Sequence, residues 1–252
     1  MKAQSKSIIC IEGLKKKYSG SDEEALKGIN LNIYRGELFG LIGPNSAGKT
    51  TLISILCGLL KFSEGSVEID GINMKMDYKK IRGKIGLIPQ EIALHPSLTV
   101  KENLNYFASL QGISGRDLDL RVEECLTILQ LHHHSKKRIS KCSGGIKRRT
   151  NLMAGLIHNP SIVFLDEPTL GVDVQSRNLI FEYLLNLNKL GVTIVYTTHY
   201  MREVESLCSR IAIIDDGIKI AEGSPEELII ANIGCNDLTQ VFIKLTGKEI
   251  RD

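Results

Sequence analysis

A short glycine-rich segment near residue 45 carries the pattern of a polyphosphate-binding loop. Gly43 is followed after four residues by Gly48-Lys49-Thr50, which matches G-x-x-x-x-G-K-[ST]. Small residues at this spacing let backbone N–H groups surround phosphate oxygens, while the ammonium reaches the terminal phosphates and the hydroxyl ligates Mg²⁺. The pattern predicts a nucleotide site, with an ordinary glycine-rich turn as the alternative. The residues expected to contact the nucleotide here are Gly43, Pro44, Asn45, Ser46, Ala47, Gly48, Lys49, Thr50 and Thr51.

Three later apolar runs each end in polar residues that suit phosphate chemistry. Such runs predict buried parallel strands, whose carboxyl ends meet at the edge where α/β sheets place ligands. Asp166 is expected to hold Mg²⁺ through water, and Glu167 to address the attacking water. A lone histidine after a strand is usually a surface residue, but a third polar strand end favours one shared site. The polar residues at these three ends are Gln90, Asp166 with Glu167, and His199.

The turn Ser143-Gly144-Gly145 indicates a second anion-binding position. Ser143 is the type of residue that caps a helix, and apolar residues at helical spacing follow it. The two glycines would leave backbone N–H groups free at the helix N-terminus, where an anion is favoured. By itself this signal is weak, because a Ser-Gly-Gly turn that caps a helix is common.

The phosphate loop requires a strand before it and a helix after it. Residues 38–42 predict a buried strand, and the apolar face from residue 50 to about residue 60 predicts a helix that points its positive dipole end at the phosphates. Alternating patterns over residues 7–35, resumed at residues 65–72, predict an antiparallel β-layer. Tyr18 lies near the end of its first strand and could stack on a base, although core packing is the default for a lone tyrosine.

Helical signals dominate residues 91–158. A capping box at Thr99 and Glu102 opens a helix to about residue 110, and residues 118–131 form a second amphipathic stretch. Three adjacent histidines, His132-His133-His134, follow this stretch. Adjacent side chains point in different directions, so a surface loop is favoured there over a zinc site.

The composition is that of a soluble globular chain without a nucleic-acid signal. The 252 residues are 42% hydrophobic and 24% charged, and they fit one large domain or one domain with an inserted lobe. The net charge of +3 is the difference between 32 basic and 29 acidic residues, which argues against a nucleic-acid partner. Three basic clusters are expected to be solvated surface: Lys15-Lys16-Lys17, Lys136-Lys137-Arg138 and Lys147-Arg148-Arg149.

Cysteine spacing and hydropathy predict a reducing compartment and no membrane segment in this chain. Six cysteines are scattered with no C-x-x-C pair, which is typical of reduced thiols in a cytosolic protein. The first six residues lack the apolar core of a signal peptide, and no stretch approaches the ~18 apolar residues of a membrane span. Any membrane role is therefore expected to come through a partner.

Taken in this order, the motifs resemble the nucleotide-binding subunit of ATP-binding cassette (ABC) transporters over nearly the whole chain. The segment from Gly43 to Thr50 resembles the Walker A loop, and residues 162–167 resemble the Walker B strand with its catalytic glutamate. Gln90 resembles the Q-loop glutamine, and His199 the switch histidine. The other matches are Cys142 to Ile146 with the signature motif, Gly171-Val172-Asp173 with the D-loop, and Tyr18 with the aromatic residue that stacks on adenine. The sequence around these motifs is similar to that of the family branch that serves drug, antibiotic and sodium exporters.

The resemblance implies an α/β fold. Its parts would be a P-loop NTPase core with a mainly parallel sheet, an antiparallel β-subdomain and an inserted helical subdomain, within one domain over residues 1–252. It implies ATP with Mg²⁺, with the metal at Thr50, Gln90 and Asp166. Residues implied in catalysis are Glu167, His199, Gln90 and Lys49.

The resemblance also implies two partners. One is a second ABC subunit, identical or different, whose Ser143-Gly144-Gly145 would close over the nucleotide. The other is an integral membrane permease on a separate chain, which would hold this cytoplasmic subunit at the inner face of the cell membrane.

Two positions of the signature depart from the usual Leu-Ser-Gly-Gly-Gln. Cys142 replaces the leucine and Ile146 the glutamine. If a hydrogen bond of the glutamine amide is lost, closure of the ATP sandwich is expected to weaken by about 0.5 to 1.5 kcal/mol. The alternative interpretation is that an apolar residue is normal at this position in the exporter branch.

Three rival functions fit less well. A GTP switch would need an aspartate that Asn188-Lys189-Leu190-Gly191 lacks, and a small-molecule kinase would explain only the phosphate loop. The strongest alternative is a soluble ABC ATPase of DNA repair, translation or cluster assembly. Such proteins usually carry two cassettes, a coiled-coil insertion or a strongly basic face, which this sequence does not show.

Overall fold

Alternating apolar residues build an antiparallel sheet at one side of the molecule. In the computed structural model, which describes residues 7–247, the strand order of this sheet is β2-β1-β4-β5. Ile11 of the first strand lies opposite Leu31 on one side and Val67 on the other, and all three side chains are buried. The predicted antiparallel pairing of the N-terminal strands is therefore observed. The strands are β1 (Ser7–Lys17), β2 (Glu24–Tyr34), β4 (Glu64–Ile69) and β5 (Ile72–Asn73).

A second sheet of six strands has the order β10-β9-β3-β8-β7-β6. Its strands run parallel from β9 to β6, and only β10 is antiparallel to its neighbour. Every residue of β3, β7 and β8 is buried, as expected for parallel strands covered on both faces. The predicted α/β fold with a mainly parallel sheet is confirmed. The strands are β3 (Leu38–Ile42), β6 (Ile85–Ile88), β7 (Ile162–Asp166), β8 (Thr193–Thr197), β9 (Arg210–Asp215) and β10 (Ile218–Gly223).

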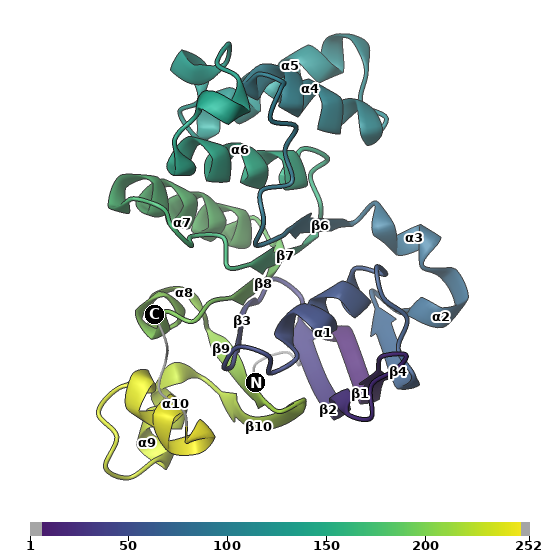
Figure 1. The fold of residues 1–252 in the computed structure, drawn as a ribbon, viewed down its shortest axis with the longest axis vertical. Helices are drawn as coiled ribbons and strands as arrows, with labels where there is room; N and C mark the ends of the chain where they lie inside the picture. The colour runs from purple at the N-terminus through teal and green to yellow at the C-terminus, as the bar shows by residue number, and fades with distance from the viewer. Residues whose placement is uncertain (1–6, 248–252) are drawn as a thin grey trace.

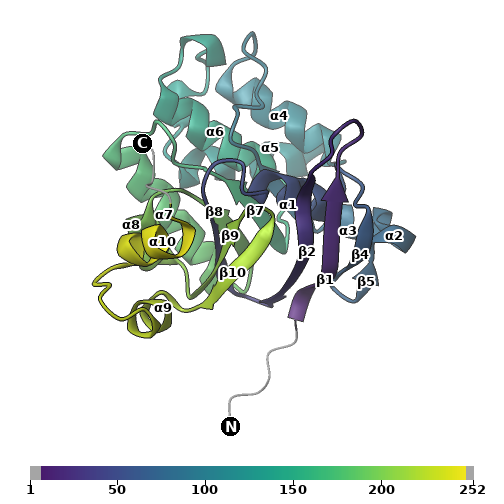
Figure 2. The ribbon, with the colours of Figure 1, turned by 60° about the horizontal axis from the view of Figure 1, so that its bottom comes forward.

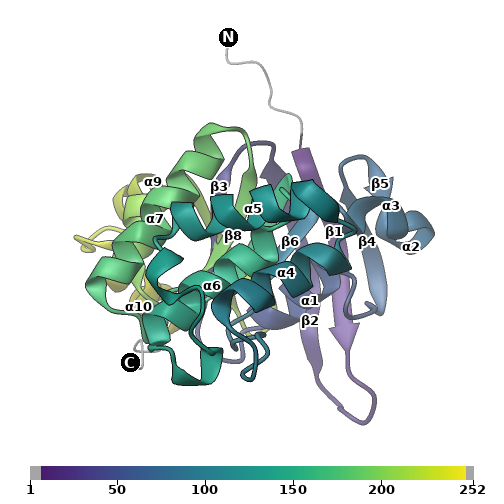
Figure 3. The same cartoon turned by 90° about the horizontal axis from the view of Figure 1, so that it is seen from above.

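A group of helices is inserted between β6 and β7. Figure 1 shows them at one end of the molecule, beyond α7, and Figure 3 shows them from above. The capping box opens the first of them, because Thr99 Oγ1 accepts from the N–H of Glu102 and the Glu102 carboxylate accepts from the N–H of Thr99. The elements are α4 (Val100–Leu110), α5 (Gly115–Ile128) and α6 (Gly144–Leu156), with 3-10 turns η1 (His132–His134) and η2 (Ile139–Lys141).

The remaining helices flank the two sheets. Figure 2 shows α9 and α10 on one side of β10, with the antiparallel sheet on the other. The helix after the phosphate loop ends at Leu56, four residues before the predicted end. The chain leaves the helix there because Gly58 takes a φ of +68°, which helical residues do not adopt. These helices are α1 (Lys49–Leu56), α2 (Met74–Asp77), α3 (Lys79–Arg82), α7 (Val174–Lys189), α8 (Met201–Leu207), α9 (Pro225–Ala231) and α10 (Leu238–Thr246).

Three further expectations concern a membrane span, the histidine run and the cysteines. Across residues 7–247, none of the helices combines the length and hydrophobicity needed to cross a bilayer. The histidine run forms a 3-10 turn rather than an irregular loop, and no group of three potential ligands gathers around a metal position in this part of the chain. All six cysteines lie within the described residues, and all are free thiols.

Candidate active site

Two glycines shape the loop that joins β3 to α1. A Cβ added at Gly43 would lie 2.1 Å from the carbonyl oxygen of Ile214, so no larger residue fits without moving backbone. Gly48 takes a φ of +104°, where an L side chain is strained, and a Cβ there would meet the Ala25 oxygen at 2.8 Å. The loop thus follows the path that the spacing predicts because its glycines allow close backbone contacts.

Lys49 places a buried positive charge inside this loop. Its side chain is 7% exposed, and Nζ donates to the carbonyl oxygens of Gly43 at 2.7 Å and Pro44 at 3.0 Å. Burial lowers the pKa of the Lys49 ammonium from its ordinary value because the charged form loses hydration, and the carboxylates of Glu167 and Asp166 oppose this effect. An arriving anion would replace the lost hydration.

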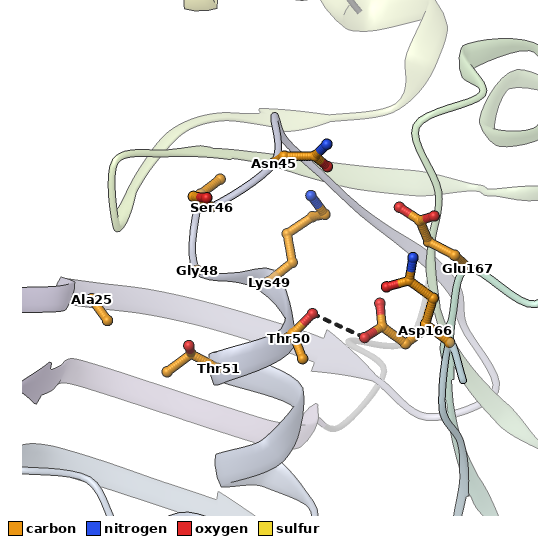
Figure 4. A pocket seen from close by; sticks show the side chains of 11 residues that line it. Ala25, Asn45, Ser46, Gly48, Lys49, Thr50, Thr51, Asp166 and Glu167 are labelled. Atoms are coloured by element: carbon orange, nitrogen blue, oxygen red, sulfur yellow. Dashed lines mark hydrogen bonds between the residues drawn. The ribbon is translucent and has the colours of Figure 1, made fainter. Parts of the chain in front are cut away.

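The loop and three of the predicted strand-end residues line one cavity of about 270 Å³. Figure 4 shows the side chains of Thr50 and Asp166 facing each other there, with Lys49 and Glu167 beside them. The cavity therefore gathers residues that lie far apart in the sequence. Its lining consists of Ala25, Asn45, Ser46, Ala47, Gly48, Lys49, Thr50, Thr51, Gln90, Asp166 and Glu167.

The oxygen atoms on one wall of the cavity are suitable ligands for a magnesium ion. Thr50 Oγ1 donates to Asp166 Oδ2 at 2.9 Å, and Thr197 Oγ1 donates to Asp166 Oδ1 at 2.6 Å. Hydroxyl and carboxylate oxygens are the hard ligands that Mg²⁺ prefers, together with substrate phosphates and water. The residues present therefore fit the predicted metal, and Gln90 adds an amide to the same cavity.

Glu167 and His199 form a pair at the cavity edge. His199 Nδ1 lies 3.1 Å from Glu167 Oε1, and the Glu167 side chain is largely buried. Glu167 has a φ of +48°, a left-handed conformation that is strained for a glutamate. Thr197 holds it there, since its carbonyl oxygen and its Oγ1 both accept from the Glu167 N–H, at 3.1 and 3.2 Å. Strain of this kind typically persists at functional positions.

Tyr18 lies next to the phosphate loop rather than in the core. It is 41% exposed, its hydroxyl is 3.1 Å from Thr51 Oγ1, and Lys16 Nζ is 5.0 Å from its ring centre. Its ring lines a neighbouring hollow of about 180 Å³ that also includes Ser46 and Ala25. Because the ring is exposed beside the phosphate loop, it is accessible to a base, and base stacking by Tyr18 stays a prediction.

The Ser143-Gly144-Gly145 turn lies outside the cavity that the phosphate loop lines. Among the described residues that line the cavity, none belongs to this turn. Ser143 occupies the N-cap position of α6, as predicted, but makes no capping bond with its side chain. Gly145 packs so tightly against the segment after β7 that an added Cβ would lie 2.5 Å from Ser176 Oγ and 2.6 Å from Asp173 Oδ2. The chain does not bring its own signature turn to its own phosphate loop.

The two unusual signature residues belong to the core of the inserted helices. Ile146 is 6% exposed and lies in the same apolar cluster as Leu104 and Leu126. Cys142 is also buried there, and its Sγ donates to the carbonyl oxygen of Arg138 at 3.3 Å. This burial favours a packing role for Ile146 within its own chain, while its effect on closure of the ATP sandwich stays a prediction.

Ile146→Gln is expected to destabilise the fold rather than strengthen dimer closure. An amide buried without partners lowers the free energy of unfolding by about 1 to 3 kcal/mol. Urea denaturation of the variant against wild type measures this, with Lys141→Gln at an exposed position as the control. A variant of unchanged stability that forms more ATP-dependent dimer would restore the interface interpretation.

Two arginines of a basic cluster predicted to be solvated, Arg148 and Arg149, make structural contacts instead. Arg148 is buried, and its Nη1 donates to the carbonyl oxygen of Gln90 at 2.7 Å. Arg149 Nη1 donates to the carbonyl oxygen of Leu129 at 2.7 Å. Arg148 lies four residues before the buried Leu152 of the same helix, so helical spacing could have placed it on the inner face. It connects α6 directly to the segment that carries Gln90.

Comparisons with known proteins agree with this geometry. A family model described as ABC transporter matches residues 26–170. The chain is 42% identical over 232 residues to the linearmycin resistance ATP-binding protein LnrL of Bacillus subtilis (strain 168), covering 92% of this chain and 74% of that protein. It is 39% identical over 232 residues to the Nod factor export ATP-binding protein I of Paraburkholderia xenovorans (strain LB400), covering 92% and 76%.

A solved structure is similar over most of its length. It is the dimeric ATP-binding cassette MJ0796 in a post-hydrolysis state bound to ADP and Pi. It matches with a TM-score of 0.79 and 32% identity, covering 86% of this chain and 98% of that one.

Proposed function

The chain belongs to the ABC transporter family, and from this premise we propose that it is the ATP-binding and ATP-hydrolysing subunit of a membrane exporter. The observation that carries the proposal is the one cavity shared by Lys49, the Thr50–Asp166 pair and Glu167, with His199 in contact with Glu167. The names of the two similar proteins, which concern export and resistance, support the direction of transport.

ATP binding would begin with an exchange of partners at Lys49. Its ammonium leaves the carbonyl oxygens of Gly43 and Pro44 and pairs with the β- and γ-phosphates, which gives a stronger, charge-assisted contact. The backbone N–H groups of the loop and the N-terminus of α1 supply further donors. Tyr18 stacks on the adenine.

Thr50, Asp166 and Gln90 would hold Mg²⁺ beside the phosphates. When bound, the ion neutralises negative charge on the phosphate oxygens. The Thr50 hydroxyl and the Asp166 carboxylate already lie 2.9 Å apart, so their oxygens need little rearrangement to face a common ligand.

Hydrolysis needs an oriented water and stabilised charge on the transferred phosphoryl group. Glu167 orients or deprotonates the water, because its carboxylate is at the cavity wall and its backbone is fixed by Thr197. His199, 3.1 Å from that carboxylate, and Lys49 stabilise the developing charge.

A second ABC subunit would complete the site. In a head-to-tail dimer, Ser143, Gly144 and Gly145 of each subunit cover the phosphates held by the other. Ser143 and Gly144 are exposed and lie outside the cavity of their own chain, and the similar MJ0796 cassette is dimeric. Neither chain alone then has a complete site.

The inserted helical lobe, residues 91–158, would transmit closure to a permease on a separate chain. Gln90 lines the nucleotide cavity, while its carbonyl oxygen accepts from Arg148 of α6, so nucleotide and lobe contact the same residue. Through this partner the subunit would lie at the inner face of the cell membrane.

Co-purification tests the proposal. The tagged chain is isolated from detergent-solubilised membranes of its own host, and ATPase activity is measured with the bound proteins. A stoichiometric integral membrane partner, with hydrolysis lowered by roughly 10²-fold or more in Glu167→Gln, is expected. Active chain that associates only with soluble protein or nucleic acid would contradict the transporter role.

A further inference from the structure

A carboxylate outside the nucleotide cavity is buried between the segments that carry Glu167 and His199. Glu203, in α8, is 4% exposed. Its oxygens accept from three hydroxyl groups: Thr169 Oγ1 at 3.0 Å, Tyr196 OH at 2.7 Å and Thr198 Oγ1 at 3.1 Å. The sequence alone does not single out Glu203, because a single glutamate in a helix carries no spacing signal.

The hydroxyl donors come from both sides of the catalytic pair. Thr169 lies two residues after Glu167, and Thr198 immediately precedes His199. Tyr196 belongs to β8, which pairs with the strand that ends at Asp166. One side chain therefore contacts both segments that place the reacting groups, although its own oxygens are absent from the cavity lining that the structure describes.

Hydroxyl groups supply the short contacts of the buried Glu203 carboxylate. A buried carboxylate requires hydrogen bonds or a cation to replace water. Arg177 Nε is 3.6 Å from Glu203 Oε1, which is too far for a hydrogen bond, so the three hydroxyl groups supply the short contacts. Burial and the nearby Glu203 charge raise the pKa of the Tyr196 phenol, which keeps it a donor.

The orientation of Thr198 connects Glu203 to the histidine segment. Because the Thr198 hydroxyl donates to Glu203, its lone pairs face elsewhere, and one accepts from the Tyr200 N–H at 3.0 Å. The Tyr200 ring in turn lies 4.2 Å from the His199 ring, centre to centre. Rotation of the Thr198 hydroxyl would therefore loosen the residues on both sides of His199.

We propose that Glu203 is a positioning residue for hydrolysis, which fixes the segments of Glu167 and His199 relative to each other. The proposal rests on the proposed roles of those two residues. It differs from a purely structural role, because it requires that turnover be lost while the fold and ATP affinity are retained.

Two substitutions remove different parts of the junction. Glu203→Gln keeps the size but replaces one acceptor oxygen by an N–H₂ donor that faces hydroxyl donors. Thr198→Val removes one hydroxyl at nearly constant volume, and Thr198→Ser restores it. Val204→Ala is the matched structural control, since Val204 is the next residue of α8, is fully buried and is apolar.

The measurements are kcat for ATP hydrolysis, affinity for the non-hydrolysable analogue AMP-PNP and thermal unfolding of the 252-residue chain. Displacement of a catalytic group by about 1 Å costs up to ~10²-fold in rate. We expect kcat to fall about tenfold or more in Glu203→Gln and Thr198→Val, with AMP-PNP affinity within about twofold of wild type. Thr198→Ser and Val204→Ala keep a kcat close to wild type.

Two results would overturn the positioning role. One is a folded Glu203→Gln with wild-type kcat, and the other is an equal loss of kcat in Val204→Ala at equal loss of thermal stability. If Glu203→Gln does not fold, the two Thr198 variants are compared instead. Equal kcat values in folded Thr198→Val and Thr198→Ser would then overturn the positioning role. Glu167→Gln is measured in parallel: if it is inactive while Glu203→Gln is normal, only the role of Glu203 fails, whereas wild-type turnover in Glu167→Gln contradicts the proposed function itself.

Discussion

Glu167→Gln is expected to lower ATP turnover by roughly 10²- to 10⁴-fold while ATP still binds. The substitution keeps the shape of the side chain and removes its charge and basicity. Binding survives because Lys49, Thr50, the loop amides and Asp166 account for the phosphates without Glu167. The left-handed backbone at position 167 is held by Thr197 through the main-chain N–H, so the substitution leaves that contact in place.

The same substitution should trap the closed dimer. With hydrolysis blocked and one negative charge removed at the interface, dimer accumulates in ATP and returns to monomer when nucleotide is withdrawn. Size-exclusion chromatography with and without ATP, paired with phosphate release, measures both effects. Glu182→Gln, an exposed position on α7, is the control. Hydrolysis at the wild-type rate would show that another group activates the water.

Lys49→Ala is expected to weaken ATP binding by about tenfold or more. The variant leaves phosphate charge uncompensated in a site where the lysine side chain is 7% exposed and water cannot substitute fully. It also leaves the carbonyl oxygens of Gly43 and Pro44 without their ammonium partner, so folding of the variant is verified first by circular dichroism.

Isothermal titration with AMP-PNP and Mg²⁺ measures the loss of affinity. Lys136→Ala is the matched control, because Lys136 is exposed on the inserted lobe, outside the cavity lining. Unchanged affinity in folded Lys49→Ala would contradict the assignment of this loop to the phosphates.

Local patterns were sufficient to predict the elements that carry the site. The glycine spacing predicts the loop because Gly43 and Gly48 must allow close backbone approach, and the observed contacts require this. The apolar runs predict β3 and β7 because parallel strands covered on both faces have no polar alternation. Polar residues directly after such strands predict a shared edge, and Gln90, Asp166 and Glu167 do line one cavity.

Only the tertiary structure decided which side chains are buried and how the polar groups pair. The sequence could not show that Ile146 packs into an apolar core, or that Arg148 binds the Gln90 carbonyl. It also could not show that Glu203 collects hydroxyl groups from two separate segments. The physical reason is that motif spacing and apolar patterning are set by neighbours in the chain, whereas strand order, burial and hydrogen bonding depend on residues that folding brings together from distant positions.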